Sequence, residues 1–512
     1  MKKTILYLVV LWISTSGWSQ TYFSEKYHYF GIHSADIATD ILQVDDGYLV
    51  PGRFVLNDST FFPKIGIKKI DKIGNEVYAK YIGLSDTTFG WHLSLLIEDY
   101  NGNPNQSGYY GIGHKSHYIK QLEISEFEGL IIRFDSQPDT LWTATIADNV
   151  LPVDTSYMFQ HCAVLPNNEL IIVGRITTNL TERKTLLIKT DSSGNELWRQ
   201  YFYFGGINYG INVISAPDHG FVLSAYVTES WPNESYPVII KTDSLGNEEW
   251  RQEFWEYNHE HGPMFISNSI DNTFIGGYLY SDSVDHSDSY NRDAIVKMNY
   301  EGELLWEKRY GFATYNKENT SLLVSQSGEI IVAGKIYGDF PQRLAYLLKV
   351  TSNGDSLWYR EYRKWWGING DNILNGVTQT IDGGYAAAGS VQPTGNKYIW
   401  VLKVDSLGCE SFDYCWTSLP GVISVEKPGE LQVFPNPATG SCTIAIPKEN
   451  QFDTYTLFIY NLMGVKMEEI VVPSGEIQVV HNLSGYAPGL YSVVTSYKGS
   501  ITGRGKFVVS GK

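Results

Sequence analysis

Apolar residues along the chain fall in short segments that are rich in β-branched and aromatic side chains and are bounded by Gly, Asn, Asp and Pro. Four such segments follow one another at residues 158–165, 169–176, 185–191 and 195–202. This pattern is typical of β-strands joined by tight turns, and no segment has sustained helical periodicity. We therefore expect an all-β chain in which each group of four segments forms one four-stranded antiparallel sheet.

One stretch of the sequence is repeated: KTDSSGNELW begins at Lys189, and KTDSLGNEEW begins at Lys241, 52 residues later. Related copies occur at intervals of 52 to 64 residues. The copies end at an aromatic residue, namely Tyr78, Trp142, Trp198, Trp250, Trp306, Trp358 and Phe412. Four strands repeated at this period indicate a β-propeller. The sequence thus predicts a seven-bladed β-propeller over residues 20–416, with one copy in each blade.

The repeated motif contains the residues that a tight turn needs. Asp191 is placed to accept hydrogen bonds from turn amides, Gly194 to adopt a positive φ, and Trp198 to pack between neighbouring blades. The corresponding residues of other copies are Asp243, Gly246, Trp250, Trp306 and Trp358. The spacing is similar to the Asp-box of sialidase propellers and to the tryptophan-bearing repeats of quinoprotein propellers, in which the motif is structural. We therefore expect a structural role, with any binding site in the loops that differ between copies.

The two ends of the repeat region complement each other. The text YFSEKYHYFG, from Tyr22, resembles the fourth-strand text LWEKRYGF, from Leu305, yet no first three strands precede it. In the seventh copy, by contrast, the fourth strand is replaced by CESFDYCW. We therefore expect the N-terminal strand to complete the last blade and close the ring, which removes two exposed sheet edges.

The chain has four cysteines. Cys409 and Cys415 are six residues apart, a spacing that can close a short loop in an oxidising compartment, and we predict a disulfide between them. Cys162 and Cys442 lie in apolar strand patterns and are expected to be small buried side chains. No paired CxxC or HxxxH spacing indicates a zinc site.

The N-terminus is typical of a secretory signal peptide. Lys2 and Lys3 precede an apolar run, and small residues stand just before Gln20. We expect residues 1–19 to be removed, so that the mature chain begins at Gln20. No later apolar run is long enough to span a bilayer, and we expect no transmembrane segment.

The charge of the chain narrows its partners. The formal net charge is −17 and the isoelectric point is about 5.1. An acidic chain of this kind does not track nucleic-acid phosphates and is not attracted to an anionic membrane surface. We therefore expect no nucleic-acid partner.

A segment rich in Pro, Gly, Ser and charge at residues 417–430 is predicted to be a linker. Residues 431–512 then show alternating strands and tight turns, which predict a small Ig-like β-sandwich. This unit resembles the type A sorting domain of the Bacteroidetes type IX secretion system. The motif residues that carry the resemblance are Pro435, Asn436, Pro437, Gly440, Gly464, Gly489 and Tyr491. The resemblance implies the type IX machinery as a partner, export through the outer membrane, usual removal of the domain, and release or attachment at the cell surface.

Two groups of residues between blades are candidates for a binding site. Trp365 and Trp366 are consecutive, so that in a strand they point to opposite faces, and an exposed aromatic platform suits a glycan or a peptide. His259 and His261 lie on one face of an extended segment, where they could share a metal or supply a base. Packing and solvent exposure, respectively, are the structural alternatives.

A calcium site is a further candidate. Four aspartates occur in the text DSVDHSDSYNRD, namely Asp282, Asp285, Asp288 and Asp293. Calcium prefers several oxygen ligands on a flexible loop, but this spacing is not that of an EF-hand. A solvated polar hairpin loop is the alternative.

Familiar catalytic motifs are absent from the sequence, including G-x-S-x-G, H-E-x-x-H and the P-loop. We therefore expect no cofactor and predict a secreted or surface-displayed binding, adhesion or scaffold module whose ligand is an extracellular protein or glycan. The alternative is a glycan-active enzyme, either a sialidase-like hydrolase or a polysaccharide lyase, on the same scaffold. A purely structural surface component is the third hypothesis.

Overall fold

The fold was examined in a computed structural model of the chain. It describes residues 22–27, 36–55, 63–82, 89–98, 108–119, 124–147, 155–178, 182–228, 235–255, 261–281, 291–310, 316–337, 343–365, 371–393, 396–410, 429–445, 455–461, 466–473, 476, 478–497 and 500–510. These residues form strands and turns without a helix, and the predicted all-β fold class is confirmed. Accordingly, none of these ranges contains a helix able to span a membrane.

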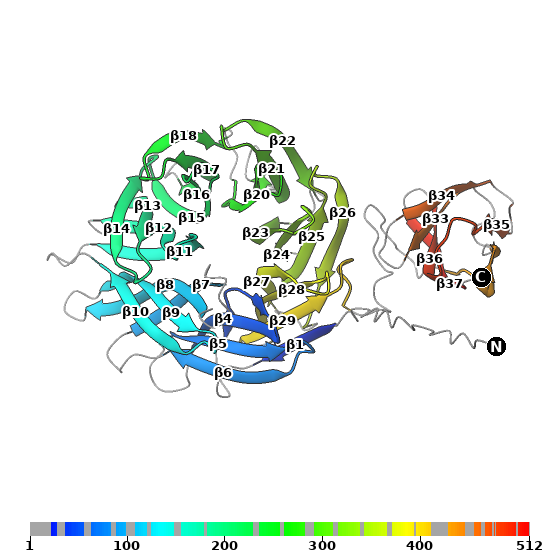
Figure 1. Ribbon diagram of the computed structural model, residues 1–512, viewed down its shortest axis with the longest axis horizontal. Coiled ribbons are helices and arrows are strands. Elements are labelled where there is room, and N and C mark those ends of the chain that lie inside the picture. Colours follow the sequence, from blue (N-terminus) through cyan, green and yellow to red (C-terminus); the bar gives the residue numbers. More distant parts are fainter. Residues whose placement is uncertain are drawn as a thin grey trace, which may run out of the picture.

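Strands β1 to β29 form seven four-stranded antiparallel blades around one axis (Figure 1). Two of the sheets each contain two blades, which are joined by a single parallel residue pair, Arg183 with Ile207 and Arg343 with Asp371. In blade one the first strand is divided into β2 and β3, which both pair with β4. The predicted seven-bladed propeller is therefore confirmed.

The strands of blades one to three are β2 (Ile37–Ala38), β3 (Leu42–Val44), β4 (Gly47–Val55), β5 (Pro63–Asp71), β6 (Glu76–Ile82), β7 (Phe89–Glu98), β8 (Gly108–Ile119), β9 (Ile124–Asp135), β10 (Thr140–Ile146), β11 (Ser156–Val164), β12 (Leu170–Thr178), β13 (Glu182–Thr190) and β14 (Glu196–Phe202). Those of blades four and five are β15 (Ile207–Ser215), β16 (Phe221–Thr228), β17 (Ser235–Thr242), β18 (Glu248–Glu253), β19 (Phe265–Asn268), β20 (Phe274–Ser281), β21 (Asn291–Met298) and β22 (Leu304–Tyr310). Those of blades six and seven are β23 (Asn316–Val324), β24 (Ile330–Tyr337), β25 (Arg343–Val350), β26 (Ser356–Tyr362), β27 (Asp371–Gln379), β28 (Tyr385–Gln392), β29 (Tyr398–Val404) and β1 (Phe23–Tyr27).

In each blade the first strand is nearest the central axis and the fourth strand is outermost (Figure 1). The rim is therefore formed by the fourth strands, which include β6, β10, β14, β18, β22 and β26. Because the strands are antiparallel, the connections alternate between the two ends of a blade. We call the end with the first-to-second and third-to-fourth turns the turn end, which in blade three holds residues 165–169 and 191–195. The other end is called the loop end, and in blade three it holds Thr178 and Glu182.

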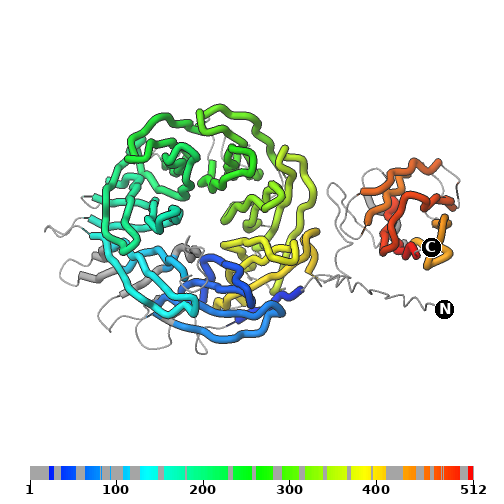
Figure 2. The backbone as a smooth tube through the Cα atoms, in the orientation of Figure 1, coloured from blue at the N-terminus to red at the C-terminus, as the bar shows by residue number. Residues whose placement is uncertain are grey.

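The ring is closed by strand β1, which pairs with β29 in a register that runs from Phe23 opposite Lys403 to Tyr27 opposite Ile399. Figure 2 shows this blue N-terminal strand beside the last strands of blade seven. The expected closure by the N-terminal strand is therefore confirmed. It gives blade seven its fourth strand and pairs the edge of β29.

The hydrophobic core lies between successive blades. Ile171 and Val173 of blade three, for example, pack in one cluster with Val213 and Leu223 of blade four. Alternating strand residues point to opposite faces of a sheet, so a blade in the ring buries both of its faces against neighbours. This explains why the middle strands are apolar almost throughout.

The C-terminal unit is a separate β-structure, whose strands are β30 (Gly429–Glu430), β31 (Val433–Thr439), β32 (Ser441–Ala445), β33 (Tyr455–Asn461), β34 (Lys466–Val472), β35 (Gln478–Asn482), β36 (Gly489–Tyr497) and β37 (Ser500–Val509). Strands β34, β33, β36 and β37 are hydrogen-bonded in that order, and β31 leads from β37 to β32 and β35. Its core contains Leu457, Ile459, Val493 and Phe507.

Candidate functional site

The turn between the third and fourth strands is built alike in most blades. In blade three, Asp191 Oδ1 accepts a hydrogen bond from the backbone amide of Asn195 at 2.8 Å, and Oδ2 accepts one from Asn195 Nδ2 at 2.8 Å. These bonds hold the pKa of the Asp191 carboxyl below its usual value. Gly194 supplies a φ of +81°, and Asp243 and Gly246 repeat the arrangement with a φ of +80°. The aspartate and glycine of the motif therefore stabilise the turn in which they lie.

The repeat tryptophan of each of blades two to six contacts the turn glycine of the next blade. A Cβ atom on Gly246 would lie 2.6 Å from the Trp198 ring, and one on Gly302 would lie 3.1 Å from Trp250. Trp250 Nε1 also donates a hydrogen bond to the carbonyl of Tyr300 at 2.8 Å. The same glycine contact is made by Trp142 with Gly194, Trp306 with Gly354 and Trp358 with Gly408. These tryptophans therefore connect neighbouring blades.

A cation precedes each of these turns by two residues, on the third strand. The seven residues are Lys69, Arg133, Lys189, Lys241, Lys297, Lys349 and Lys403. Lys241 is almost fully buried, and its Nζ lies 2.6 Å from Asp218 and 2.7 Å from Glu249. The other lysines pair in the order above with Asp46, Glu169, Asp271, Glu329 and Asp382.

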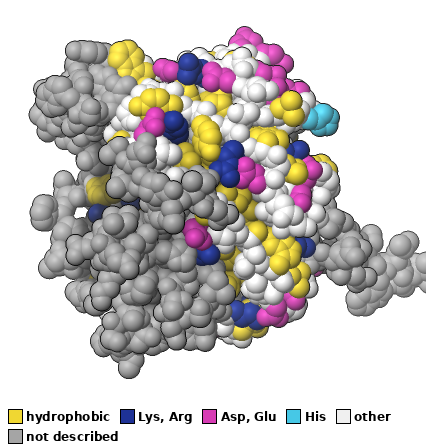
Figure 3. Space-filling model, turned by 90° about the vertical axis from the view of Figure 1, so that its left-hand side faces the viewer, with side chains coloured by type: hydrophobic (Ala, Val, Ile, Leu, Met, Phe, Trp, Pro, Cys, Tyr) yellow, Lys and Arg dark blue, Asp and Glu magenta, His cyan; other side chains and the backbone are white. Residues whose placement is uncertain are grey.

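Lys297 holds the pKa of Asp271 down to about 2, mainly through their hydrogen bond. Sequence analysis missed this system of ion pairs, although the Lys-x-Asp spacing is present in most copies. The spacing alone does not identify a partner, because each carboxylate comes from another part of the blade. In these pairs the lysine of the repeat is neutralised by a carboxylate of the propeller itself, because a buried cation needs a partner of opposite charge. On the rim shown in Figure 3, basic side chains lie beside acidic ones rather than in a patch of one sign.

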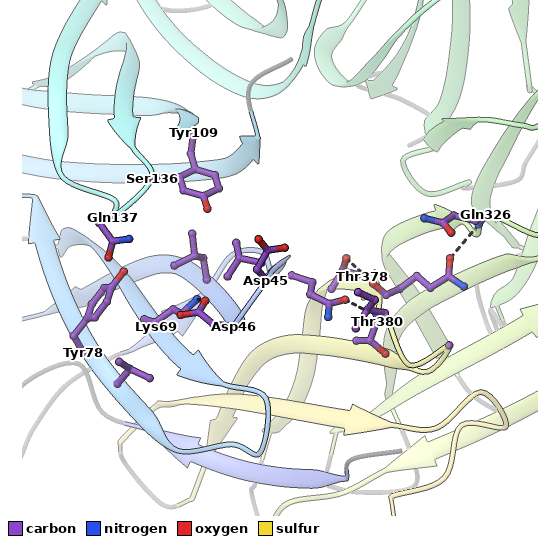
Figure 4. Close-up of a pocket in the computed structure, with 17 residues that line it drawn as sticks. Asp45, Asp46, Lys69, Tyr78, Tyr109, Ser136, Gln137, Gln326, Thr378 and Thr380 are labelled. Atoms are coloured by element: carbon purple, nitrogen blue, oxygen red, sulfur yellow. Dashed lines mark hydrogen bonds and ion pairs between the residues drawn. The ribbon is translucent and has the colours of Figure 1, made fainter. Parts of the chain in front are cut away.

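A cleft of about 800 Å³ opens at the turn end of blades one, two, six and seven (Figure 4). It is lined by Gln43, Val44, Asp45, Asp46, Leu49, Lys69, Val77, Tyr78, Tyr109, Ser136, Gln137, Gln326, Thr378, Gln379, Thr380, Ile381 and Gly383. The lining combines carboxamides and hydroxyls from several turns with the tyrosines of blades one and two. The volume is that of a typical small-molecule or oligosaccharide site.

Two glutamines of the cleft bridge adjacent blades. Gln43 Oε1, in blade one, accepts a hydrogen bond from the backbone amide of Ile381, in blade seven, at 2.8 Å. Gln379 Oε1, in blade seven, accepts one from the backbone amide of Gln326, in blade six, at 3.0 Å. The carboxamide nitrogens of Gln43 and Gln379 make no hydrogen bond with any described residue. Each carboxamide is thus held by its oxygen and retains its two donors.

The charged groups of the cleft largely neutralise one another. Asp46 forms an ion pair with Lys69, whose hydrogen bond lowers the pKa of the Asp46 carboxyl. Burial and then the Asp46 charge raise the pKa of Tyr78 to about 12, so the Tyr78 hydroxyl remains a hydrogen-bond donor at neutral pH. Asp45 is exposed and forms no ion pair with the described residues. The cleft therefore offers mainly neutral donors and acceptors, which suit a ligand rich in hydroxyl groups.

A second hollow of about 300 Å³ lies at the turn end between blades four and five. It is lined by Pro217, Asp218, Glu249, Trp250, Asn272, Tyr300 and Glu301. Asp218, Glu249 and Trp250 already belong to the ion pairs and the tryptophan contacts described above. We therefore assign this hollow to the structural contacts between the two blades.

The aromatic pair predicted as a binding platform divides between described and undescribed residues. Trp365 is half-buried and packs against the core of blade seven. Its backbone amide donates a hydrogen bond to Asn372 Oδ1 at 2.9 Å, which holds it beside the first strand of that blade. This placement favours packing for Trp365. Trp366 lies outside the described residues.

The histidine pair is divided in the same way, because His259 lies outside the described residues. His261 is buried before β19 and stacks on Tyr280 with their ring centroids 4.7 Å apart. Its backbone amide donates to the carbonyl of Ser235 at 2.7 Å. Solvent exposure, the structural alternative for His261, is therefore wrong, because its ring packs on Tyr278 and Tyr280, which belong to the core between blades four and five. His261 and Trp365 lie two blade boundaries apart and form no common site.

The calcium candidates are not brought together by the described structure. Asp293 lies on strand β21 rather than in a hairpin loop, and its side chain is fully buried. Its carboxylate accepts a hydrogen bond from the Tyr346 hydroxyl and lies 3.2 Å from Lys317 Nζ. The expected loop position is therefore wrong for Asp293, whose charge is compensated between blades five and six. The remaining candidates, Asp282, Asp285 and Asp288, lie outside the described residues, among which no group of three or more metal-ligating side chains occurs.

The described cysteines are buried. Cys162 and Cys442 are free thiols, as expected, and burial raises the pKa of Cys162 to about 12 and that of Cys442 to about 11. Cys409 is buried just after strand β29. Its predicted partner, Cys415, lies outside the described residues, so the disulfide between them stays a prediction.

In the C-terminal unit, the asparagine of the FPNP motif joins two strands. Asn436 Nδ2 donates a hydrogen bond to the carbonyl of Lys506 at 3.2 Å, and Asn436 Oδ1 accepts one from the amide of Val508 at 2.8 Å. Pro435 and Pro437 flank it, each after a cis peptide bond. The motif thus attaches β31 to β37 through one side chain.

Other motif residues of this unit have local structural roles. Tyr491 is buried on β36, and its ring stacks on Phe507 with centroids 5.6 Å apart. Gly440 has a φ of +81° in the turn between β31 and β32, and Gly489 is the first residue of β36. Gly464 lies outside the described residues. The sorting motif is therefore a set of contacts that builds this unit.

Comparison with known proteins identifies the C-terminal unit. Residues 432–510 match the family model described as the secretion system C-terminal sorting domain. The predicted sorting domain is thus confirmed, and it marks the protein for secretion or for the outer surface of the cell. The match covers this unit only. The signal peptide predicted at residues 1–19 lies outside the described residues and stays a prediction.

No curated protein matches the chain significantly. Among solved structures, an ulvan lyase described as a new family of polysaccharide lyase is 10% identical, with a TM-score of 0.47 over 78% of this chain and 99% of that one. The β-propeller domain of the trilobed protease from Pyrococcus furiosus is 9% identical, with a TM-score of 0.38 over 76% and 100%. A protein of unknown function from Dyadobacter fermentans is 9% identical, with a TM-score of 0.42 over 61% and 95%. At these values we draw nothing about activity from them.

Proposed function

We propose that the protein is an exported propeller that acts as a binding module and holds an extracellular glycan in the cleft at the turn end of blades one, two, six and seven. The observation that carries this proposal is the pair of inter-blade glutamines, Gln43 and Gln379. Their oxygens are fixed by backbone amides of the neighbouring blade, and their nitrogens remain as oriented donors. Preorganised neutral donors and acceptors beside tyrosines are suited to the hydroxyl groups of a sugar.

The charge of the cleft favours binding over glycan hydrolysis. Glycoside hydrolases generally use two carboxyl groups that flank the scissile bond, one as an acid and the other as a base or nucleophile. In the cleft, Asp46 is engaged by Lys69, and Asp45 is the remaining carboxylate of the lining. A glycan-active enzyme is the competing hypothesis, which predicts the release of sugar fragments.

The sorting domain supports an extracellular role. We propose that residues 1–19 are removed before Gln20, that the propeller comprises residues 20–416, and that a linker at 417–430 connects it to the sorting domain at 431–512. In this scheme the type IX machinery carries the chain from the periplasm across the outer membrane. Polysaccharides of the cell surface or of the surroundings are then accessible to the cleft.

The test is a glycan-array screen of the full chain, followed by calorimetric titration with the best oligosaccharide. A Gln43→Ala/Gln379→Ala double variant removes the two carboxamides that carry the proposal and is expected to weaken binding by about tenfold or more, since each lost hydrogen bond costs about 1 kcal/mol. Gln252→Ala, on the exposed face of β18, is the matched control and should bind like the wild type. Failure to bind any glycan, or release of fragments from a bound one, would contradict the proposal.

A further inference from the structure

Two arginines lie together at the loop end of blade three. Arg175 is on β12 and Arg183 is near the start of β13. Arg175 is opposite Thr185, which is two residues after Arg183, so both arginines project from the same face of the sheet. This face is directed at blade four.

Both guanidinium groups meet the same tyrosine of blade four. The Arg175 guanidinium carbon lies 4.8 Å from the centre of the Tyr209 ring, and Arg183 Nη1 donates to the Tyr209 hydroxyl at 3.5 Å. Tyr226 is opposite Tyr209 on the neighbouring strand, with ring centroids 6.3 Å apart. All four side chains are half-buried and still reach solvent. The two blades thus form a cationic and aromatic corner.

The charge of this corner is not balanced by an ion pair with any described residue. The nearest carboxylate in sequence, Glu182, pairs with Lys184 at 3.2 Å on the other face of β13. Arg175 instead contacts the sulfur of Met158, and the Nε atoms of Arg175 and Arg183 are buried without a hydrogen-bond partner. Burial, together with the charge of Arg183, lowers the pKa of Arg175. Unpaired and partly desolvated cations are costly, so an anion that joins them would be bound favourably.

Blade six shows how the same positions look when they are neutralised. Lys335 occupies the position of Arg175, and its Nζ lies 2.9 Å from Glu318. Arg343 occupies the position of Arg183, and its Nη1 lies 3.3 Å from Asp371. Each cation therefore has an internal carboxylate partner from the adjacent strand.

The two blades can be compared residue by residue, because their strand registers are alike. In blade three the residue opposite Arg175 is Met158, at the position of the blade-six glutamate. The residue that pairs with Arg183 is Ile207, at the position of the blade-seven aspartate. Blade three thus has both cations but has apolar side chains at the positions of the two carboxylates. This leaves the charge of both cations available for an external anion.

We propose that Arg175 and Arg183 form an oxyanion subsite for the carboxylate or sulfate group of an acidic polysaccharide. A guanidinium group binds such oxyanions in a planar, bidentate manner, and two of them enclose one group. Tyr209 and Tyr226 supply ring surfaces on which the sugar ring of the same residue packs. The subsite lies at the loop end of blades three and four and is independent of the cleft, which lies at the turn end.

The experiment measures binding of the full chain to four polymers: polygalacturonate, dextran sulfate, neutral dextran and polyglutamate. Polygalacturonate and dextran sulfate distinguish a carboxylate ligand from a sulfate ligand. We expect one or both to bind and neutral dextran not to compete at this subsite. Polyglutamate carries the carboxylate without the sugar ring and is expected to bind at least about tenfold more weakly than polygalacturonate, or than dextran sulfate if that is the better ligand.

Two variants of blade three locate the site. Arg175→Gln/Arg183→Gln removes the charge, and Met158→Glu/Ile207→Asp supplies the two carboxylates that blade six contains. Both are expected to reduce the affinity for the acidic polysaccharide by about tenfold or more. Lys335→Gln/Arg343→Gln, which removes the paired cations of blade six, is the matched control and should leave the affinity within about twofold.

Thermal unfolding of each variant verifies that the ring is intact, and the arginine variant decides the question if the acidic variant does not fold. The proposal is overturned if neither anionic polysaccharide binds the wild type, or if the blade-three variants bind as the wild type does. Equal or tighter binding of polyglutamate would assign the corner to an acidic peptide and would overturn the polysaccharide assignment. Loss of neutral-glycan binding in the cleft variants leaves these results unchanged, so the two proposals fail separately.

Discussion

Phe23 packs its ring against Gly74, so closely that a Cβ atom on the glycine would lie 2.7 Å from the ring. Trp198 and Gly246 make the same contact between blades three and four of the propeller. The hydroxyl of Tyr27, four residues after Phe23, donates to the carbonyl of Gly74 at 2.6 Å. The N-terminal strand thus reproduces the aromatic contacts of a fourth strand as well as its hydrogen bonds, and it connects blade seven to blade one.

Replacing this ring should open the closure. Phe23→Ala removes a buried aromatic side chain and is expected to reduce the free energy of unfolding by about 3 kcal/mol, in the range for such truncations. Urea denaturation followed by tryptophan fluorescence measures the change. Glu25→Gln, at an exposed position of the same strand, is the control and should have little effect. Equal stabilities for the two variants would show that Phe23 does not hold the ring closed.

The glycine contact can be separated from the glycine conformation. Gly246 and Gly383 have φ values of +80° and +81°, but a Cβ on Gly383 would meet nothing within 4 Å. Both Gly→Ala variants are destabilised by backbone strain, because both positions have a positive φ. Only Gly246→Ala also displaces Trp198. We expect Gly246→Ala to be less stable than Gly383→Ala by about 1 to 3 kcal/mol, the usual cost of overpacking. Denaturation midpoints that coincide would refute the tryptophan contact.

The ion pairs make the folding stability of the propeller depend on pH in the acid range. Lys297 lowers the pKa of Asp271 from its ordinary value of 3.8 to about 2. The folded state therefore binds this proton more weakly than the unfolded state, so the stabilisation is present above pH 3.8 and is lost as the pH falls toward 2. Asp271→Asn should flatten this part of the stability profile, measured as the urea midpoint at each pH. Glu301→Gln removes an exposed carboxylate outside the ion pairs and should leave the slope unchanged.

The disulfide predicted between Cys409 and Cys415 can be detected directly. Non-reducing peptide mapping by mass spectrometry should find the two residues in one cross-linked peptide, while Cys162 and Cys442 react with an alkylating reagent after unfolding. Recovery of Cys409 and Cys415 as separate alkylated thiols from the exported protein would rule the bond out.

The sorting domain should be separable from the ring. Deletion of residues 431–512 is expected to leave a folded propeller in the periplasm, because the seven blades form their cores without the C-terminal unit. Cell fractionation with antibody detection locates the protein, and protease resistance reports the fold. Normal surface delivery of the shortened chain would refute the role of the domain in export.

The fold was predictable because its information is local and repeated. Copies of one motif reveal the period, and strand patterns within a period reveal four strands. The closure was predictable for the same reason, since Phe23 belongs to text that resembles a fourth strand. Once a segment is identified as the fourth strand of a repeat, the repeat predicts the strand with which it pairs.

The candidate sites were less predictable because they depend on which residues the ring brings together. The carboxylates that neutralise Lys241 come from the turn between first and second strands and from the fourth strand, and no sequence spacing specifies both. Arg175 and Arg183 stand out only when the strand register identifies Met158 and Ile207 as their neighbours. Charge compensation depends on the three-dimensional structure. The sequence therefore shows which residues are cations, but it does not show which of them have a carboxylate partner.

The errors among the expected residues have a common physical origin. His261 and Asp293 are polar residues in segments whose sequence is typical of a loop, and such a pattern predicts exposure. In the ring, both are buried between blades, where stacking on Tyr280 and pairing with Lys317 satisfy them. Interfaces between blades accept polar groups when a partner is available, which comes from the same blade for His261 and from the neighbouring blade for Asp293.

The pairing of β1 with β29 also makes the closed ring depend on both ends of the propeller. Phe23 and its partner Lys403 are 380 positions apart, so nearly the whole propeller lies between them. A chain that stops before blade seven would lack the partner strand of β1 and would keep an exposed sheet edge. Only a chain that contains both β1 and β29 can form the closed ring.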